Sequence, residues 1–197
     1  MIRKLKADEI EVKVKQVIKT EKWSGFVALL YKTARVDMDI LDETYGIEGW
    51  QCEYETIKDN LYCKIGIWNK ELGQWIWKQD CGIESKTDKG NEKKGEASDA
   101  FKRAGFKVGI GRELYTSPNI LIPAEVITKD GNAYLKDKYE TYSVNEIQYD
   151  DKGDIASLGI ADRKGNIVFV WKKQGFNAHK EQKPTYKEAK DGDYIPY

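Results

Sequence analysis

The sequence has few of the residues on which nucleophilic and metal sites depend. It contains one histidine, His179, and three cysteines, Cys52, Cys63 and Cys81, none of them in CxxC spacing. A single histidine argues against Ser-His-Asp and Cys-His catalytic sites and against the common zinc arrangements. An odd number of scattered cysteines is typical of reduced thiols in the cytosol. We therefore expect no catalytic residue and no metal site.

Long apolar runs and nucleotide-binding loops are also missing. No segment approaches the roughly 20 apolar residues of a membrane-spanning helix, so we expect no membrane contact. Residues 1–16 lack the apolar core of a signal peptide, which favours a cytoplasmic location. Gly109-Ile110-Gly111 has no Gly-Lys-Ser/Thr ending and follows a predicted helix instead of a strand, so it is not a phosphate loop. We expect no cofactor and no use of ATP.

The sequence also has no excess of either charge, with 33 Lys and Arg against 33 Asp and Glu. A nucleic-acid-binding protein is usually basic, so the total charge counts against that class. The charge is unevenly distributed, however. Residues 36–50 carry five acids and no base, whereas residues 86–112 carry eight bases and four acids. Because attraction of a charged ligand depends on the local field, the basic segment could still bind phosphate.

The clearest helical pattern lies in this basic segment, over residues 94–115. Lys102 and Arg103 lie off the apolar stripe of the helix, so the pattern predicts two neighbouring cations that face away from the core. Such a pair can bind phosphate, although a Lys-Arg pair on a helix is more often only a solvated surface. Gly109 and Gly111 predict the end of the helix. The stripe consists of small and apolar residues at steps of three and four: Ala97, Ala100, Phe101, Ala104 and Val108.

Two blocks of the sequence carry recognisable motifs. The later block reads Lys94-Gly95, Ala97-Ser98-Asp99-Ala100, Lys102-Arg103-Ala104 and Gly109-Ile110-Gly111-Arg112-Glu113-Leu114-Tyr115. The earlier block reads Tyr31-Lys32-Thr33-Ala34-Arg35, then Leu41-Asp42-Glu43, Gly46 and Trp50. Together they resemble the Rad-fifty-two superfamily of single-strand annealing proteins, most closely its bacterial DdrA-like and phage-encoded members. The resemblance covers about residues 7–115.

The resemblance implies a protein that binds single-stranded DNA and anneals complementary strands in recombination or repair, without ATP. It implies a homo-oligomer, a ring or a filament, that holds DNA in a basic groove with the bases exposed. A nuclease or a single-strand binding protein is an expected partner, and a phage-encoded member would act in the host cytoplasm. Residue by residue, the DNA contacts fall on Lys102 and Arg103, with Arg35, Lys94, Ser98 and Lys107 as further candidates.

Four other residues of these blocks are interpreted as structural. Arg112 and Tyr115 are expected to join the helix end to a neighbouring element or subunit. Asp42 and Glu43 belong to the acidic segment, and we expect them to pair with basic residues at a subunit contact.

The sequence predicts an α+β fold. We expect a curved antiparallel β-meander of three strands packed around one long helix, with an additional C-terminal β-meander and a flexible tail. The order of helix, three strands and long helix is also the order that the resemblance implies. The expected domains are an annealing core at 1–123, a β-rich elaboration at 124–173 and the tail at 174–197.

Alternating polarity and turn residues support these elements. A short helix is predicted at 37–45, with Asp37 as its N-cap, and Asn91 is predicted to cap the long helix after a polar loop at 85–91. Residues 1–22 fit both a helix and a strand. Two hairpin turns are predicted, at Asp-Asp-Lys-Gly-Asp (150–154) and Asp-Arg-Lys-Gly-Asn (162–166). The predicted strands are 50–57, 61–68, 74–83, 142–149, 155–161 and 167–171.

Two other functions compete with annealing. Metal-dependent nucleases use an Asp on one strand and Glu-x-Lys on the next, which Asp80 and Glu92-Lys93-Lys94 match loosely. The third class is an oligomeric scaffold without affinity for DNA. The Lys102-Arg103 pair argues against this class.

Two tryptophans have an open interpretation. Trp75 and Trp77 alternate around Ile76 on a predicted strand and could stack on bases. Packing in the core or in a subunit interface is the favoured interpretation, because the predicted sheet has one buried face.

Overall fold

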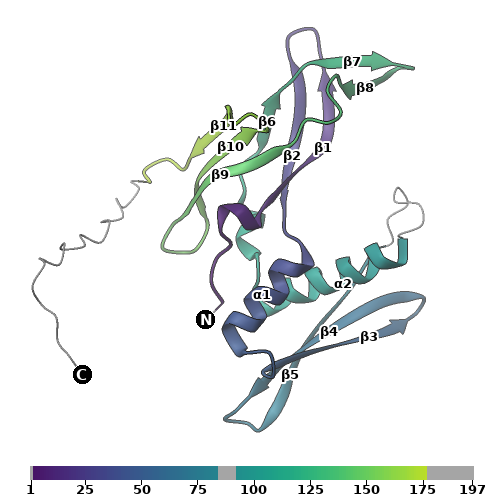
Figure 1. The fold of residues 1–197 in the computed structure, drawn as a ribbon, viewed down its shortest axis with the longest axis vertical. Helices are drawn as coiled ribbons and strands as arrows, with labels where there is room; N and C mark the ends of the chain where they lie inside the picture. The colour runs from purple at the N-terminus through teal and green to yellow at the C-terminus, as the bar shows by residue number, and fades with distance from the viewer. Residues whose placement is uncertain (1, 84–91, 177–197) are drawn as a thin grey trace, which may run out of the picture.

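A computed structural model describes residues 2–83 and 92–176 of the chain. Of the described residues, 46% lie in strands and 22% in helices. Two helices form a middle layer, with a three-stranded sheet on one side and a six-stranded sheet on the other (Figure 1). The loop predicted at 85–91, its Asn91 cap, His179 and the tail from residue 177 lie outside the described residues.

The six-stranded sheet joins the N-terminal and C-terminal parts of the chain. All its neighbouring strands are antiparallel, and its two edge strands also contact each other, so the sheet is nearly closed. In order across the sheet, the strands are β11 (Ile167–Lys172), β10 (Ile155–Asp162), β9 (Tyr142–Tyr149), β1 (Glu11–Lys19), β2 (Ser24–Tyr31) and β6 (Ile120–Pro123).

Alternation along β2 separates the core from the outer surface. Phe26, Ala28 and Leu30 are buried, whereas Leu29 and Tyr31 face the other side of the strand. A strand places successive side chains on opposite faces, so this one short strand both fills the core and offers an outer wall.

The hairpin turns on either side of β10 form as predicted. Asp150 and Asp154 close the first turn, and Asp162 and Asn166 close the second, each through a backbone hydrogen bond of 2.9 Å. The glycine in each turn has a positive φ, which glycine adopts without steric strain.

The three-stranded sheet packs against the longer helix. Its strands are β3 (Trp50–Ile57), β4 (Asn60–Asn69) and β5 (Gln74–Cys81), in that order. Cys63 and Ile65 of β4 are fully buried and belong to the main hydrophobic core. The ring of Phe101, on the helix, lies 6.0 Å from that of Trp50, on β3.

The two helices are α1 (Ala34–Tyr45) and α2 (Glu92–Val108). The stripe predicted on α2 is present, with Ala100, Phe101 and Ala104 buried. The predicted N-cap of α1 was wrong. Thr33 caps the helix by accepting a hydrogen bond from the amide of Val36, and Asp37 lies fully buried one turn inside. A residue inside the first turn can point inward, which the pattern of acidic residues alone does not reveal.

Short elements complete the fold. They are the 3-10 turns η1 (Ala7–Glu9) and η2 (Arg112–Thr116) and the hairpin of β7 (Val126–Lys129) and β8 (Asn132–Leu135). The N-terminal segment before η1 connects the layers. The amide of Leu5 donates to Glu113 of η2 at 2.8 Å, and its carbonyl accepts from the Tyr149 hydroxyl at 2.8 Å.

The predicted fold class was wrong. The described part of the chain is mostly β, with two α-helices and a nearly closed six-stranded sheet, instead of one long helix packed with three strands. The strands predicted as a C-terminal elaboration pair with β1 through β9, so one sheet contains residues from both sides of the expected boundary at 123. Local alternation identifies strands but does not reveal which distant strands pair, and the pairing decides the fold class.

Candidate functional site

A groove of about 720 Å³ lies between β2, α2 and η2. One wall consists of residues 27–31 of β2, with Lys15 from β1 beside them. The opposite wall is one face of α2, where Lys102 and Arg103 are neighbours, with Asp99 one turn before them and Phe106 one turn after. The 3-10 turn η2 forms one end. The groove therefore lies between the six-stranded sheet and the long helix.

The groove is positively charged. Four of its lining side chains are cationic and one is acidic, counting the described residues. Lys15 and Arg103 are exposed, and Lys102 is half-buried. Within a concave surface such an excess of one charge attracts the opposite charge, although the whole chain is neutral.

A buried ion pair lies at the base of the groove. The Lys32 ammonium donates to both carboxylate oxygens of Asp37 at 2.5 Å and to the backbone carbonyl of Lys102 at 3.2 Å. Burial raises the pKa of Asp37 to about 6, and the nearby Lys32 only partly offsets this. Burial also lowers the pKa of Lys32, against the attraction of Asp37. The pair links the end of β2 to both helices.

Two glycines make room for this pair. A Cβ on Gly105 of α2 would lie 2.5 Å from a carboxylate oxygen of Asp37, and a Cβ on Gly111 would lie 2.6 Å from the Lys32 side chain. Gly111 also has φ of 75°, in the left-handed region. Gly105, on one face of α2, and Gly111, just after the end of α2, therefore both allow close packing against the ion pair.

Aromatic side chains line the groove as well. Tyr115 is 79% exposed, and its ring lies 4.6 Å from that of Phe106. On the opposite wall Tyr31 is 39% exposed, with the Lys13 ammonium 5.3 Å from its ring centroid. Exposed rings beside cations are the two components with which proteins hold single-stranded nucleic acid.

The structure brings only two of the six predicted DNA contacts into the groove. Lys102 and Arg103 line it, whereas Lys107 lies further along α2 and donates to the Gln79 carbonyl at 2.8 Å. The other three candidates, Arg35, Lys94 and Ser98, are not among its lining residues. Arg35 lies within α1, where it is exposed and forms no hydrogen bond or ion pair with the described residues.

The sequence interpretation missed two cations of the groove, Lys15 and Lys32. Lys15 lies on a strand of alternating Lys and apolar residues, where it resembles any solvated lysine. Lys32 is adjacent to Tyr31 within a recognised block, but nothing in the local pattern marks a lysine as buried. Spacing to Asp37, five residues on, would have been the only hint of an ion pair.

Three cations of α2 already have carboxylate partners. Lys102 lies 3.7 Å from Asp99 on the same helix. Arg103 and Lys107 both reach Asp80 of β5, at 3.6 and 3.4 Å. The predicted pair of cations is therefore divided, because Lys102 pairs along α2 while Arg103 pairs with the three-stranded sheet.

Arg112 has a structural role, as we interpreted it. Its guanidinium donates to the backbone carbonyls of Phe106 at 2.9 Å and Lys107 at 2.8 Å, two of the last carbonyls of α2. The Phe106 carbonyl also accepts from the amide of Gly109 at 3.1 Å. Tyr115 differs, since so exposed a ring is not explained by packing within one chain.

Asp42 and Glu43 of α1 have partners within the chain. Asp42 accepts a hydrogen bond from the indole of Trp50 at 2.6 Å, and Glu43 pairs with Arg3 at 2.5 Å. Arg3 also pairs with Glu9 at 2.7 Å, and these hydrogen bonds raise the pKa of the guanidinium. These contacts within the chain account for the carboxylates of Asp42 and Glu43, and their role at a subunit contact stays a prediction.

The geometry does not assemble the nuclease motif. Asp80 pairs with Arg103, and Arg103 lies eleven residues along α2 from Glu92, about 16 Å at 1.5 Å per residue. Among the described residues, no three His, Cys, Asp or Glu side chains lie close enough to hold a metal ion.

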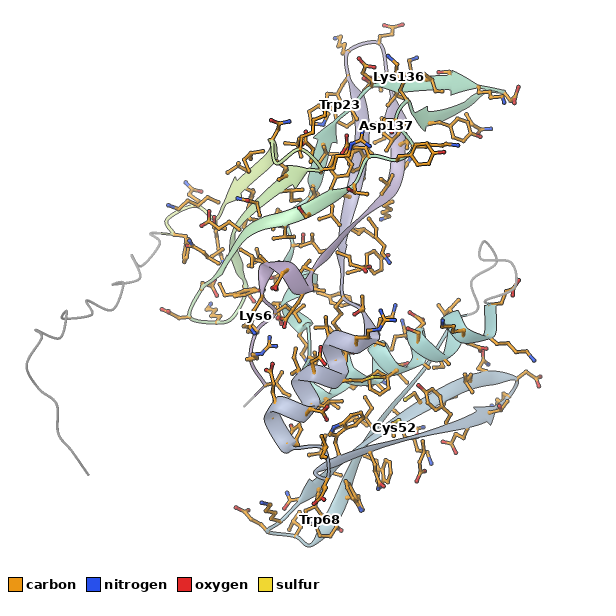
Figure 2. The ribbon with its side chains drawn as sticks, viewed as in Figure 1. Lys6, Trp23, Cys52, Trp68, Lys136 and Asp137 are labelled. Atoms are coloured by element: carbon orange, nitrogen blue, oxygen red, sulfur yellow. The ribbon has the colours of Figure 1, made fainter. Side chains whose placement is uncertain are left out.

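Three tryptophans of the smaller sheet, Trp68, Trp75 and Trp77, lie on the face opposite α2, whereas Trp50 packs against Phe101 of that helix. Trp75 pairs with Trp68, and the two rings are 5.3 Å apart. Trp77 lies over Gly66, where a Cβ would meet its ring at 2.9 Å, and is 38% exposed. Trp68, also partly exposed, lies at the end of the sheet remote from the six-stranded sheet (Figure 2). Trp77 is therefore outside the main core, and its packing in a subunit interface stays a prediction.

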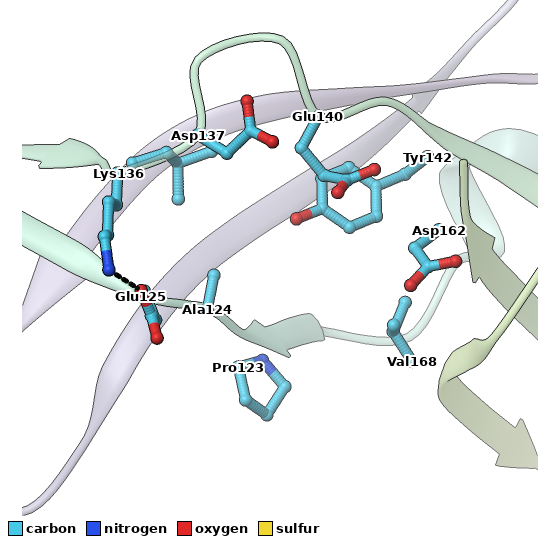
Figure 3. Close-up of a pocket in the computed structure, with 10 residues that line it drawn as sticks. Pro123, Ala124, Glu125, Lys136, Asp137, Glu140, Tyr142, Asp162 and Val168 are labelled. Atoms are coloured by element: carbon cyan, nitrogen blue, oxygen red, sulfur yellow. Dashed lines mark hydrogen bonds and ion pairs between the residues drawn. The ribbon is translucent and has the colours of Figure 1, made fainter. Parts of the chain in front are cut away.

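A second pocket, of about 520 Å³, has the opposite charge. It lies where the link between β6 and β7 meets the end of β8 and the strands β9 to β11 (Figure 3). Lys136 pairs with Glu125 at 2.6 Å, and Arg163 pairs with Asp137 at 2.9 Å. The excess of carboxylates disfavours phosphate here, so this pocket is not a candidate for nucleic acid. Its acidic lining residues are Glu125, Asp137, Glu140 and Asp162.

Comparison with known proteins adds no family. No protein-family model, no curated protein and no solved structure matches the chain.

Within residues 2–83 and 92–176, no helix is both long enough and apolar enough to span a membrane.

Proposed function

We propose that the protein binds single-stranded DNA in the groove between β2 and α2, without sequence preference, and promotes annealing of complementary strands without ATP. The observation that carries this proposal is the combination, in one groove, of three accessible cations, Lys15, Lys102 and Arg103, and exposed aromatic rings. Resemblance of the two sequence blocks to single-strand annealing proteins points to the same function.

In this proposal the two kinds of side chain have different tasks. Lys15, Lys102 and Arg103 neutralise phosphates, which releases the counterions condensed on the strand. Tyr31 and Tyr115 stack on bases, which any base can do because every base has a π-face. A groove that holds the backbone by charge and the bases by stacking leaves the hydrogen-bonding edges of the bases free for a complementary strand.

The proposal also includes a homo-oligomer that acts in the cytoplasm, with a nuclease or a single-strand binding protein as partner. An oligomer would extend the groove of one chain into a continuous path for DNA. Light scattering tests this part, because it distinguishes a monomer of 22.7 kDa from its multiples, with and without DNA.

The central experiment replaces Lys102 and Arg103 together by Ala. Binding of fluorescein-labelled oligo-dT is measured by anisotropy between about 50 and 200 mM salt. The parent should bind with a steep salt dependence. The variant should bind about tenfold or more weakly at low salt, with a log–log slope smaller by about 1.4, since each lost phosphate contact removes about 0.7. Annealing of complementary oligonucleotides should decline in parallel.

A matched control removes two cations elsewhere. Lys129, on β7, and Lys164, in the turn between β10 and β11, are both exposed and do not line the groove. Their replacement by Ala changes the net charge equally and should leave binding and its salt slope close to those of the parent. Equal losses in both double variants would refute the groove as the site, and a parent without DNA affinity would favour the scaffold.

A further inference from the structure

Asp80 is the shared partner of two cations beside the groove. It lies at the end of β5, and its side chain is 18% exposed. One carboxylate oxygen lies 3.6 Å from Nε of Arg103, and the other lies 3.4 Å from Nζ of Lys107. Both cations are more exposed than Asp80, at 44% and 49%. One carboxylate thus partly neutralises two basic side chains that a phosphate could reach.

The carboxylate is held more firmly than the cations. Asp80 belongs to a strand, and its Oδ1 also accepts a hydrogen bond from the amide of Cys81 at 2.9 Å. Arg103 and Lys107 reach it with long side chains that have many rotamers and lie one helical turn apart. Lys107 also donates to the Gln79 carbonyl at 2.8 Å, whereas Arg103 lines the groove. When a DNA phosphate approaches, Arg103 can therefore turn towards it first, and Lys107 can follow while the carboxylate stays on β5.

We propose that Asp80 sets the affinity of the groove for single-stranded DNA, by occupying Arg103 and Lys107 in the free protein until phosphates replace it. This inference rests on the proposed function. With Asp80 ionised, these three side chains carry a net charge of +1, and without it they carry +2. Binding is then an exchange of one anion for another, which reduces affinity and keeps the strand from being held too tightly for a second strand to pair with it.

The test replaces Asp80 by Asn in the full chain. Asn keeps an oxygen that can accept the Cys81 amide but removes the charge. Affinity for labelled oligo-dT should rise about two- to tenfold at low salt, the range expected for releasing two exposed ion pairs. The increase should shrink as salt rises, because screening weakens interactions between exposed charges. A structural effect on folding would not depend on salt in this way.

Two variants control for charge and for position. Asp80→Glu keeps the carboxylate and should bind as the parent does. Glu53→Gln removes one acid from β3, the other edge of the sheet, and should leave affinity unchanged. If Asp80→Asn does not fold, as judged by its thermal melt, Asp80→Ser replaces it in the same assay.

A double-variant comparison shows whether Asp80 acts through the two cations. In a background of Arg103→Ala and Lys107→Ala, Asp80→Asn should no longer raise the affinity. An increase that persists in that background would overturn the inference, as would an Asp80→Asn variant that binds like the parent or more weakly. If the parent itself does not bind oligo-dT, the proposed function fails instead, so the two failures are distinguishable.

Discussion

Replacing Lys32 by Met should destabilise the protein strongly at pH 8. Met has a similar length and is apolar, so it keeps the packing of the lysine chain and removes only the charge. The ammonium makes three hydrogen bonds, two of them to Asp37, whose side chain has no exposed surface. The variant would leave a buried carboxylate without a cationic partner. Such a loss typically costs about 3–5 kcal/mol of unfolding free energy, measurable by urea denaturation.

The same pair makes stability depend on pH. In the parent the pKa of Asp37 is raised from 3.8 to about 6 by burial, so the folded protein binds this proton more tightly than the unfolded chain does. The stability that the proton contributes is complete below about pH 4 and is lost as pH rises through about 6. The change in unfolding free energy is about 3 kcal/mol, because each unit of difference in pKa corresponds to about 1.4 kcal/mol. In Lys32→Met the unpaired carboxyl should bind its proton at higher pH still, so the cost of the substitution should shrink towards pH 5.

The double variant Lys32→Met, Asp37→Leu separates charge from packing. It replaces both buried charges by apolar groups. At pH 8 its unfolding free energy should therefore equal that of the parent or exceed it by up to about 4 kcal/mol. The reasoning is refuted if the single variant loses less than about 1 kcal/mol at pH 8, or if the double variant is less stable than the single one.

Two further substitutions separate the fold from the site. Tyr115→Ala should leave the unfolding free energy almost unchanged, since the ring is 79% exposed, but should weaken binding of oligo-dT by about 1–3 kcal/mol; unchanged affinity would exclude stacking on this ring. Phe101→Ala removes a buried aromatic ring that contacts Trp50, so urea denaturation should show a loss of about 3–5 kcal/mol. A smaller loss would mean that the core can collapse around the missing ring.

The elements that the sequence predicted well are those with local signals. The three strands of the smaller sheet lie where alternation placed them, and α2 buries the stripe of Ala100, Phe101 and Ala104. In each hairpin turn on either side of β10, an Asp is followed three residues later by a Gly, and this pattern determines the local backbone. In each case the residues that form the element also contain the information needed to recognise it.

The features that the sequence did not reveal depend on distant contacts. Residues 1–22 fit two templates, and only pairing of β1 with β2 and β9 decides for the strand. Lys32 reads as an ordinary surface lysine until its partner Asp37 is known to be buried. Asp80 was recognised only as part of a nuclease motif, because nothing in the sequence places it beside Arg103. Of the residues that line the candidate groove, the sequence therefore predicted Lys102 and Arg103 as DNA contacts and missed Lys15 and Lys32.

The N-terminal segment has a consequence for the order of folding. Leu5 is bonded through its amide to Glu113 and through its carbonyl to Tyr149, and Glu11 of β1 pairs with Ser143 of β9. During synthesis the first residues therefore emerge long before their partners exist. Contacts so distant in sequence slow folding, and β1 exposes an unpaired edge until they form. We expect the hairpin of β1 and β2 to form early and the larger sheet to close only after β9 has left the ribosome.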